Sequence, residues 1–546
     1  MCGILGGTGK NWNYYGALMS MVHRGPDGQK ITDVSRRLTM GFARLAIIDL
    51  SDNAMQPMVS FDGNVYITFN GEIYDYAELR KELINKGYKF KSTSDTEVLL
   101  NAYCEWGDEF INHVDGMFGI AIYDKRSDML KLYRDRAGIK PLYWFFDGKE
   151  FAYASELKGI ENLVLDNDFT IDNTALYDYY NYLYIPEPKT IYKNVFKLES
   201  AHRLAYDLAN NKIIYNEKYW DLHVNCEEGS SAGPSEEQCY QVRTLIKKSI
   251  RSQLIADVSV GGFLSGGIDS SIIAVEAYAN SSSYQTFAMG FYDFETNELP
   301  YVECLEKHAG FSAHKHLVKK EEFLSLYTNM KEWYDEPFAD TSAYPTYLVS
   351  KATKKNCTVA LSGDGGDEVF GGYSRYSWFS DYVRKGNEDI YEFLWRIHTY
   401  DPKFDRSELK SKLKISNDYD DYWFYRKYYI EELPPITRMQ YLDFWTYLPC
   451  DVLTKTDRVG MAVSLETRVP LLAKDIIEYA FSLNQSERCY NGELKGILKT
   501  AYRGRIPDNL LYRRKWGFGI PQSFFGHDKN PQTELENRVF RYGQQI

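Results

Sequence analysis

Over roughly the first 200 residues, hydrophobic and polar residues alternate in short segments, a pattern typical of half-buried β-strands. The segments with this pattern are 38–48, 65–69, 118–123, 130–134, 143–146 and 151–154. Between them, residues 76–86 and 96–106 have the spacing of amphipathic helices. This order predicts an α+β domain built on antiparallel strands.

Near residue 240 the pattern changes to a regular alternation of strands and helices. The predicted strands are 258–264, 286–291, 315–318 and 358–362, and the predicted helices are 271–279, 301–309 and 343–354. Such alternation is typical of a parallel, doubly wound sheet. After about residue 375 the pattern is mostly helical, and we expect this part to wall off a site in the second domain.

A small, polar segment at 225–235 separates the two patterns and has the composition of a linker. We therefore expect a first domain at 1–205, a connector and linker at 206–237, and a second domain at 238–546. A chain of 546 residues is long enough for two large domains, each with its own core.

The charge and hydropathy of the chain argue against several classes of protein. The chain has 64 Lys and Arg against 76 Asp and Glu, a net charge of −12, so we expect no broad basic face for nucleic acid or anionic lipid. The longest apolar run, 117–123, has seven residues, whereas a membrane-spanning helix needs about 20. The first residues lack the basic and apolar regions of a secretory signal, so we expect a cytoplasmic protein. Eight cysteines without a C-x-x-C pair indicate neither a disulfide framework nor a zinc site.

Cys2 is the first candidate for chemistry. If Met1 is removed, Cys2 carries the α-amine, whose pKa is normally about 8 and which can accept the proton of the adjacent thiol. Nucleophile and base then belong to one residue. The alternative interpretation is a small residue in an edge strand.

Four further residues suit an amino acid placed over that thiolate. Asn70 and Gly71 end a predicted strand, and their amide groups can point at a developing oxyanion; the alternative is a plain Asn-Gly turn. Arg44 can clamp an α-carboxylate, and Asp95 can accept from an α-ammonium. Asp95 is alternatively the N-cap of a helix with Glu97 in its first turn.

The segments around these residues resemble the class II glutamine amidotransferase domain of the asparagine synthetase family. They are Met1-Cys2-Gly3-Ile4, His23-Arg24-Gly25-Pro26-Asp27, Arg44-Leu45-Ala46-Ile47-Ile48-Asp49, Asn70-Gly71-Glu72-Ile73-Tyr74 and Ser94-Asp95-Thr96-Glu97. The resemblance implies an N-terminal-nucleophile (Ntn) fold in which Cys2 is the nucleophile and Asn70 and Gly71 form the oxyanion hole. It implies that these two residues, Arg44, Glu72 and Asp95 bind glutamine, and that 23–27 is structural.

The second domain has a glycine-rich loop at a predicted strand-to-helix turn. Backbone amides in such a turn can surround phosphate oxygens, and the helix N-terminus adds positive potential. The loop, Ser265-Gly266-Gly267-Ile268-Asp269-Ser270, follows Leu264 and differs from the G-x-x-x-x-G-K-[ST] loop. It looks like the pyrophosphate loop of enzymes that split ATP between the α and β phosphates; the alternative is an ordinary Gly/Ser turn.

A second loop, Ser362-Gly363-Asp364-Gly365-Gly366-Asp367-Glu368, also follows an apolar strand. Asp364 and Asp367, with Asp269, offer hard oxygen ligands for a Mg²⁺ ion that bridges phosphates. The alternative is an acidic surface loop. Lys495, in Glu493-Leu494-Lys495-Gly496, is either a cation for the adenylation step or a solvated helix residue.

These segments and Ser464-Leu465-Glu466-Thr467-Arg468-Val469-Pro470 resemble the synthetase domain of the same family, an α/β doubly wound, ATP-pyrophosphatase-type domain. The resemblance implies that Ser362, Gly363 and the first loop contact ATP, and that Leu264 and Met289 border the adenine. It also implies that Asp364 and Lys495 are catalytic and that Asp269 and Asp367 bind metal.

The resemblance covers residues 2 to about 520 and implies ATP-dependent amidation of aspartate through a β-aspartyl-AMP intermediate, with ammonia released from glutamine. The expected partners are glutamine, ATP and aspartate, with a homodimer as the candidate assembly. Ala473 and Gly262 depart from the family pattern and leave the acceptor open. The alternatives are the same chemistry on another carboxylate, such as a surface-polysaccharide uronate or a secondary metabolite, or a catalytically silent binding protein.

Overall fold

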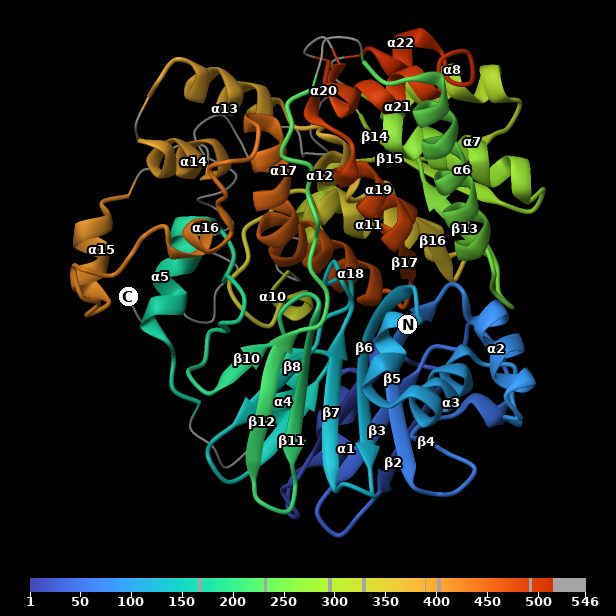
Figure 1. Cartoon of the computed structure of the whole chain (residues 1–546), viewed down its shortest axis with the longest axis vertical. Helices are drawn as coiled ribbons and strands as arrows, with labels where there is room; N and C mark the ends of the chain where they lie inside the picture. Colours follow the sequence, from blue (N-terminus) through green and yellow to red (C-terminus); the bar gives the residue numbers. More distant parts are fainter. Residues whose placement is uncertain are drawn as a thin grey trace.

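The computed structural model describes residues 1–164, 169–229, 233–292, 297–326, 330–387, 389–399, 404–490 and 493–513. Figure 1 shows a lower domain, coloured blue to green, beneath an upper domain, coloured green to red. The start of the chain lies where the two domains meet. Among the described residues, every helix is too short or too polar to span a lipid bilayer.

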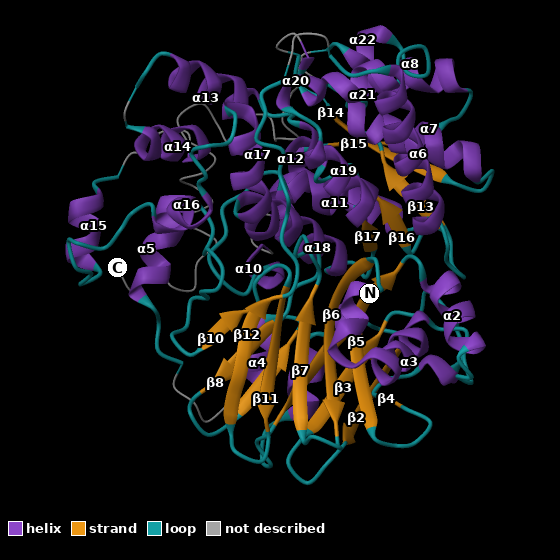
Figure 2. Ribbon diagram, viewed as in Figure 1, coloured by secondary structure: helices purple, strands orange, loops and turns teal. Residues whose placement is uncertain are grey.

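The first domain contains two six-stranded antiparallel sheets, whose strands fill the lower half of Figure 2. The first sheet has the order β10 (Val195–Lys197), β8 (Tyr143–Phe146), β9 (Phe151–Ala154), β1 (Gly3–Gly7), β3 (Thr39–Arg44) and β2 (Gly28–Asp33). The second has the order β12 (Lys212–Lys218), β11 (His202–Asp207), β7 (Met129–Arg134), β6 (Gly116–Asp124), β5 (Val65–Ile73) and β4 (Met58–Val59).

Apolar side chains hold this domain together in layers. One cluster, which includes Ile4, Phe42 and Leu132, lies between the two sheets. A second cluster packs α1 (Tyr14–Ser20), α4 (Leu157–Leu163) and α5 (Asn173–Tyr182) on the first sheet. A third packs α2 (Tyr76–Asn85) and α3 (Asp95–Trp106) on the second sheet. The alternating pattern therefore produces a helix–sheet–sheet–helix sandwich.

The structure corrects two details of this domain. Strand β5 continues through Asn70 and Gly71 to Ile73, so these residues are not in a turn. They pair with Gly119 and Phe118 of β6, and this pairing keeps the strand extended. The expected domain end at 205 falls inside β11, and β11 and β12 extend the second sheet to Lys218.

The second domain contains a five-stranded sheet whose neighbouring strands are all parallel, as the sequence predicts. Its order is β15 (Ala313–Val318), β14 (Gln285–Phe291), β13 (Val260–Phe263), β16 (Val359–Leu361) and β17 (Glu466–Arg468). The crossovers include α7 (Ile268–Asn280), α8 (Leu299–Ala309) and α11 (Ala343–Lys354), and α6 (Glu236–Gln253) precedes the sheet. The strand order reverses between β13 and β16, and ligands of such sheets bind beyond the carboxyl ends of the strands at this point.

The second domain also contains a series of shorter helices. They are α9 (Lys320–Leu326), α10 (Met330–Trp333), α12 (Gly366–Phe370), α13 (Ser374–Arg384), α14 (Ile390–Thr399), α15 (Arg406–Lys412), α16 (Trp423–Tyr428), α17 (Pro435–Trp445), α18 (Thr454–Met461), α19 (Lys474–Ser482), α20 (Gln485–Arg488), α21 (Gly496–Ala501) and α22 (Asp508–Leu511). The helical prediction after residue 375 missed β17, which has only three residues and lacks an alternating pattern.

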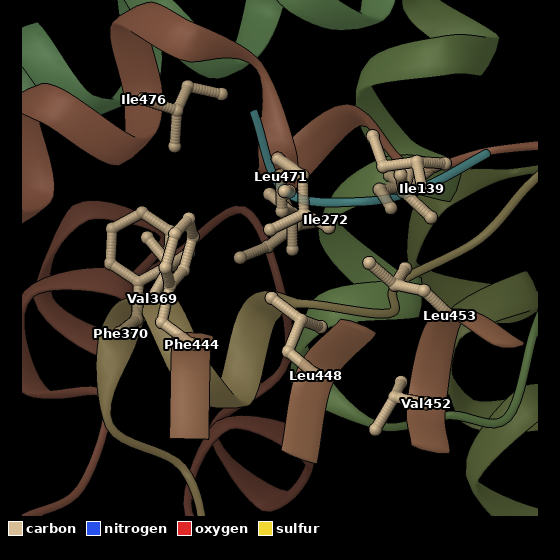
Figure 3. Packing of buried hydrophobic residues seen from close by; sticks show 14 of the residues in the cluster. Ile139, Ile272, Val369, Phe370, Phe444, Leu448, Val452, Leu453, Leu471 and Ile476 are labelled. Atoms are coloured by element: carbon tan, nitrogen blue, oxygen red, sulfur yellow. The ribbon is translucent and has the colours of Figure 1, made fainter. Parts of the chain in front are cut away.

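Several hydrophobic clusters contain residues of both domains. Ile139 of the first domain belongs to the same cluster as Ile272, Leu453 and Leu471 of the second, and Figure 3 shows these side chains in the packed interior. Burial of apolar surface across this boundary stabilises one relative position of the domains.

Candidate functional site

The first predicted site is a pocket where the start of the chain meets the ends of β3 and β5 and the start of α3. Of the predicted residues, Cys2, Arg44, Gly71, Glu72 and Asp95 line it. The backbone amide of Cys2 donates to Asn70 Oδ1 at 2.9 Å, and the thiol Sγ lies 3.8 Å from the carbonyl of Leu45. Burial raises the pKa of the Cys2 thiol, so a nearby base is needed to form the thiolate.

Gly71 lines this pocket from within strand β5, whereas Asn70 is not among the lining residues and contacts Cys2 through its side chain. Asn70 Nδ2 is buried and has no hydrogen-bond partner among the described residues, so it is a donor available for a ligand oxygen. A Cβ on Gly71 would lie 2.0 Å from the carbonyl oxygen of Met117, so the close approach of β6 requires glycine here. The oxyanion-hole role of these two residues stays a prediction, and they occupy a strand instead of a turn.

Arg44 and Asp95 have local partners that hold them at the pocket. The Arg44 guanidinium donates to the carbonyls of Ser51, at 2.8 Å, and Asp49. Asp95 Oδ2 accepts from the backbone amide of Ile73 at 3.1 Å. The N-cap of α3 is Ser94, and Asp95 is the first residue of the helix, so its carboxylate is not used as the cap. Burial raises the pKa of Asp95 to about 6.

Glu72 has a partner that the sequence did not identify. Its Oε2 lies 2.9 Å from Nη2 of Arg468, which comes from β17 of the second domain. Arg468 Nε also pairs with Glu466 Oε1 at 2.6 Å. Glu466 Oε2 in turn lies 2.5 Å from the terminal ammonium of Met1. The segment 464–470 carried a resemblance to the family, but no sequence signal placed it beside the first site.

The second predicted site lies at the carboxyl ends of β13 and β16, where the strand order reverses. The loop after β13 turns through Gly266, which has a φ of +68°, and α7 begins after Gly267. The Ser270 hydroxyl accepts from the Ser265 backbone amide at 3.2 Å and lies 3.1 Å from the Ser265 hydroxyl. A small loop with amides at a helix start is an anion-binding geometry.

The loop after β16 touches the first loop directly. A Cβ on Gly363 would meet Asp269 Cβ at 2.9 Å and the Ser270 amide at 3.1 Å, and one on Gly366 would lie 2.6 Å from Asp269 Oδ1. The glycines therefore allow the two loops to close on each other. Residues separated by almost a hundred positions in the chain form one site.

Lys495 joins the acidic residues of both loops. Its ammonium pairs with Asp269 and, at 2.6 Å, with Asp367. Although burial acts to lower it, the pKa of Lys495 is raised because these two carboxylates surround the ammonium. Lys495 is buried, with 5% of its surface exposed, so the solvated-helix interpretation is wrong.

Asp364 lies in a different arrangement on the same loop. Its Oδ2 accepts from the Ser362 hydroxyl at 2.8 Å and from the Thr456 hydroxyl of α18 at 2.9 Å. No sequence signal pointed to Thr456 as a partner of Asp364. These two hydroxyls orient the Asp364 carboxylate beside the glycine-rich loops.

The residues expected to border the adenine, Leu264 and Met289, are buried near the carboxyl ends of β13 and β14. The Leu264 amide donates to the Phe287 carbonyl at 2.9 Å. Of the two departures from the family pattern, Gly262 has a clear reason: a Cβ there would lie 1.9 Å from the hydroxyl of Tyr284. Tyr284 thus occupies the space of a larger side chain. Ala473 is buried at the start of α19, and the structure shows no consequence for the site.

The fold and the two sites define a class. The protein is a glutamine-dependent amidotransferase, a carbon–nitrogen ligase, in which an Ntn-type domain precedes an ATP-pyrophosphatase-type domain with a parallel sheet. The family model described as "Glutamine amidotransferase domain" matches residues 1–220, and the one described as "Asparagine synthase" matches residues 241–540.

The chain belongs to the glutamine-hydrolysing asparagine synthetase family. It is 34% identical over 536 residues to "Asparagine synthetase [glutamine-hydrolyzing] 1" of Bacillus subtilis, covering 92% of this chain and 82% of that protein. It is 35% identical over 395 residues to "Putative asparagine synthetase [glutamine-hydrolyzing] 2" of Methanocaldococcus jannaschii, covering 67% and 74%. It is also 28% identical over 577 aligned positions to "Amidase chry2" of Gibberella zeae, covering 92% and 84%.

Proposed function

We propose that this chain makes asparagine from aspartate, ATP and glutamine. In the second domain, an oxygen of the aspartate side-chain carboxylate attacks the α-phosphorus of ATP, which forms β-aspartyl-AMP and expels pyrophosphate. Ammonia then attacks the acyl carbon, and asparagine forms as AMP leaves. The ammonia comes from glutamine hydrolysis in the first domain, which also yields glutamate.

The first half of the reaction uses Cys2 as nucleophile. With Met1 removed, the Cys2 amine lies near Asn70 Oδ1, and it can take the thiol proton as the sulfur attacks the amide carbon of glutamine. The free Nδ2 of Asn70 and the amide of Gly71 would stabilise the oxyanion. Arg44 would bind the α-carboxylate, and Glu72 and Asp95 the α-ammonium.

The second half is supported by one observation above all: Asp269, Asp367 and Lys495, from three separate segments, converge beside the two glycine-rich loops. Fixed charge at these loops would stabilise pyrophosphate as it leaves. Lys495 would balance the charge on the phosphates, and Asp364 would support formation of the acyl-adenylate.

A Mg²⁺ ion fits the same residues. Protein Mg²⁺ sites typically use one or two carboxylates together with substrate phosphates, and Asp269 and Asp367 supply two carboxylates that already share a cation, the Lys495 ammonium. In the described part of the chain no group of three or more potential metal ligands is assembled, and phosphate oxygens and water would complete the set. When bound, the ion supplies Lewis-acid neutralisation of phosphate charge.

Product analysis tests the proposal. Purified protein supplied with glutamine, ATP, Mg²⁺ and aspartate should release asparagine, glutamate, AMP and pyrophosphate in equal amounts, and intact-mass measurement should show that Met1 is absent. Pyrophosphate release only with another carboxylate, such as a uronate, would reassign the acceptor. Full activity with Met1 retained would contradict the role of Cys2.

A further inference from the structure

Arg468 connects the two domains through its side chain. The residue is fully buried at the end of β17, in the second domain. Its Nη1 donates to the carbonyls of Gln253 and Ile255, both at 2.8 Å, so the guanidinium is held from its own domain. Its Nη2 reaches across to Glu72 at 2.9 Å.

We propose that Arg468 completes the glutamine site from the opposite domain by holding the Glu72 carboxylate in an ion pair that favours its charged form and orients it toward the α-ammonium of glutamine. Arg468 is then a positioning residue, because it acts on glutamine through Glu72. The inference rests on the proposed role of Glu72 in binding that ammonium.

The surroundings of Glu72 explain why a cation is needed. Asp95 on α3 and Glu466 on β17 are acidic groups that face it and disfavour its charge. Burial is the main reason that the pKa of Glu72 is raised well above its usual value, although Arg468 and the terminal ammonium act to lower it. A protonated Glu72 has no charge to attract an ammonium group. Tyr74 and Tyr76, which follow Glu72 in the chain, lie close enough for their own pKa values to be raised by its charge.

The main chain of Arg468 serves the other site. Its carbonyl accepts from the Ser362 amide at 2.8 Å, at the start of the loop that bears Asp364. A side-chain substitution leaves this backbone bond in place. Loss of the guanidinium should therefore affect glutamine binding more than adenylation.

Arg468→Gln tests whether the guanidinium affects glutamine binding more than adenylation. The KM for glutamine in the glutaminase assay should rise by about 30-fold or more, the usual consequence of removing one member of a buried charge pair. The loss should shrink as pH rises, because hydroxide deprotonates the unsupported Glu72 carboxyl group. Arg468→Lys, which keeps the positive charge, should recover part of the affinity at neutral pH.

Arg488→Gln is the matched control. Arg488 is equally buried but contacts the carbonyls of Ala480 and Leu483 and the side chain of Thr437, all in the second domain. It reports the general cost of deleting a buried guanidinium and should leave the pH profile of the KM for glutamine unchanged. If Arg468→Gln does not fold, the Arg468→Lys profile carries the test, with an expected rise in the apparent pKa for glutamine binding.

A Glu72→Gln variant tests the role of Glu72 separately from the role of Arg468. If it leaves the KM for glutamine unchanged, the proposed role of Glu72 fails. If Glu72→Gln raises the KM and a folded Arg468→Gln gives the parent KM and pH profile, the role of Arg468 is wrong while the glutamine site stands.

Discussion

The glutamine pocket and the ATP site assemble their charges in different ways. In the first domain, Glu72 lies on a strand of the sandwich and Asp95 on a helix that covers it. Both side chains are buried. In the second, Asp269 and Asp367 lie just inside helices that begin at glycine-rich turns, and Lys495 arrives from a distant segment to pair with them. The first site therefore depends on the antiparallel sheets, whereas the second depends on loops that meet where the strand order of the parallel sheet reverses. Single substitutions should therefore separate the two activities.

Replacing the nucleophile should separate them most completely. Cys2→Ala removes the only thiol in the glutamine pocket's described lining, so glutamine-dependent synthesis should fall by at least ~10³-fold. Synthesis from added ammonium salt should continue, because the second site is intact. Both rates are measured as asparagine formed. Equal loss of both in a folded variant would contradict the two-site scheme, and Cys104→Ala is a control outside the pocket.

The reciprocal substitution is Asp364→Ala. It removes the carboxylate held by the Ser362 and Thr456 hydroxyls and should lower pyrophosphate release by about 10²-fold or more while glutaminase activity persists. Pyrophosphate and glutamate are measured in parallel. Asp475→Ala, at an exposed pair with Lys248, is the control and should leave both rates unchanged. Normal pyrophosphate release by the Asp364 variant would remove this residue from the chemistry.

A packing change in β13 should test how strongly the second site depends on the strand that leads into its first loop. Gly262→Val places side-chain atoms where the Tyr284 hydroxyl now lies and should lower the free energy of unfolding of the second domain by about 1–3 kcal/mol. Denaturant unfolding measures the effect, and the glutaminase rate shows whether the first site is spared. Adding Tyr284→Phe, which removes the clashing oxygen, should restore part of the stability. An unchanged midpoint in Gly262→Val would show that β13 moves freely to accommodate the side chain.

The smallest effect is a pH dependence confined to the first site. Because burial raises the pKa of Asp95 to about 6, its carboxylate is charged above that pH and neutral below it. We expect kcat/KM for glutamine hydrolysis to fall up to ~10-fold per pH unit below pH 6, since a neutral Asp95 binds the α-ammonium poorly. Asp95→Asn should weaken binding at neutral pH and remove this inflection. An inflection that persists in Asp95→Asn would assign it to another group.

Much of both sites follows from local sequence. The position of Cys2, the glycines that turn the chain after β13 and β16, and the predicted strands β8 and β9 all depend on near neighbours, so the residue pattern identifies them. The same reasoning from near neighbours wrongly predicts a turn at Asn70 and Gly71. An Asn-Gly pair favours a turn unless a neighbouring strand supplies hydrogen bonds. Strand β6 does so here.

The amino-acid sequence by itself determined the two fold classes, the order of the domains and the chemical identity of each candidate group. Only the tertiary structure decided which polar side chains face each other: Arg468 beside Glu72, Lys495 between Asp269 and Asp367, and Thr456 against Asp364. The physical reason is the distance along the chain over which each kind of interaction acts. Backbone geometry ties a residue to positions a few places away, but the ionisation of a buried carboxylate is set by whichever distant side chain the packed sheets bring within hydrogen-bonding distance.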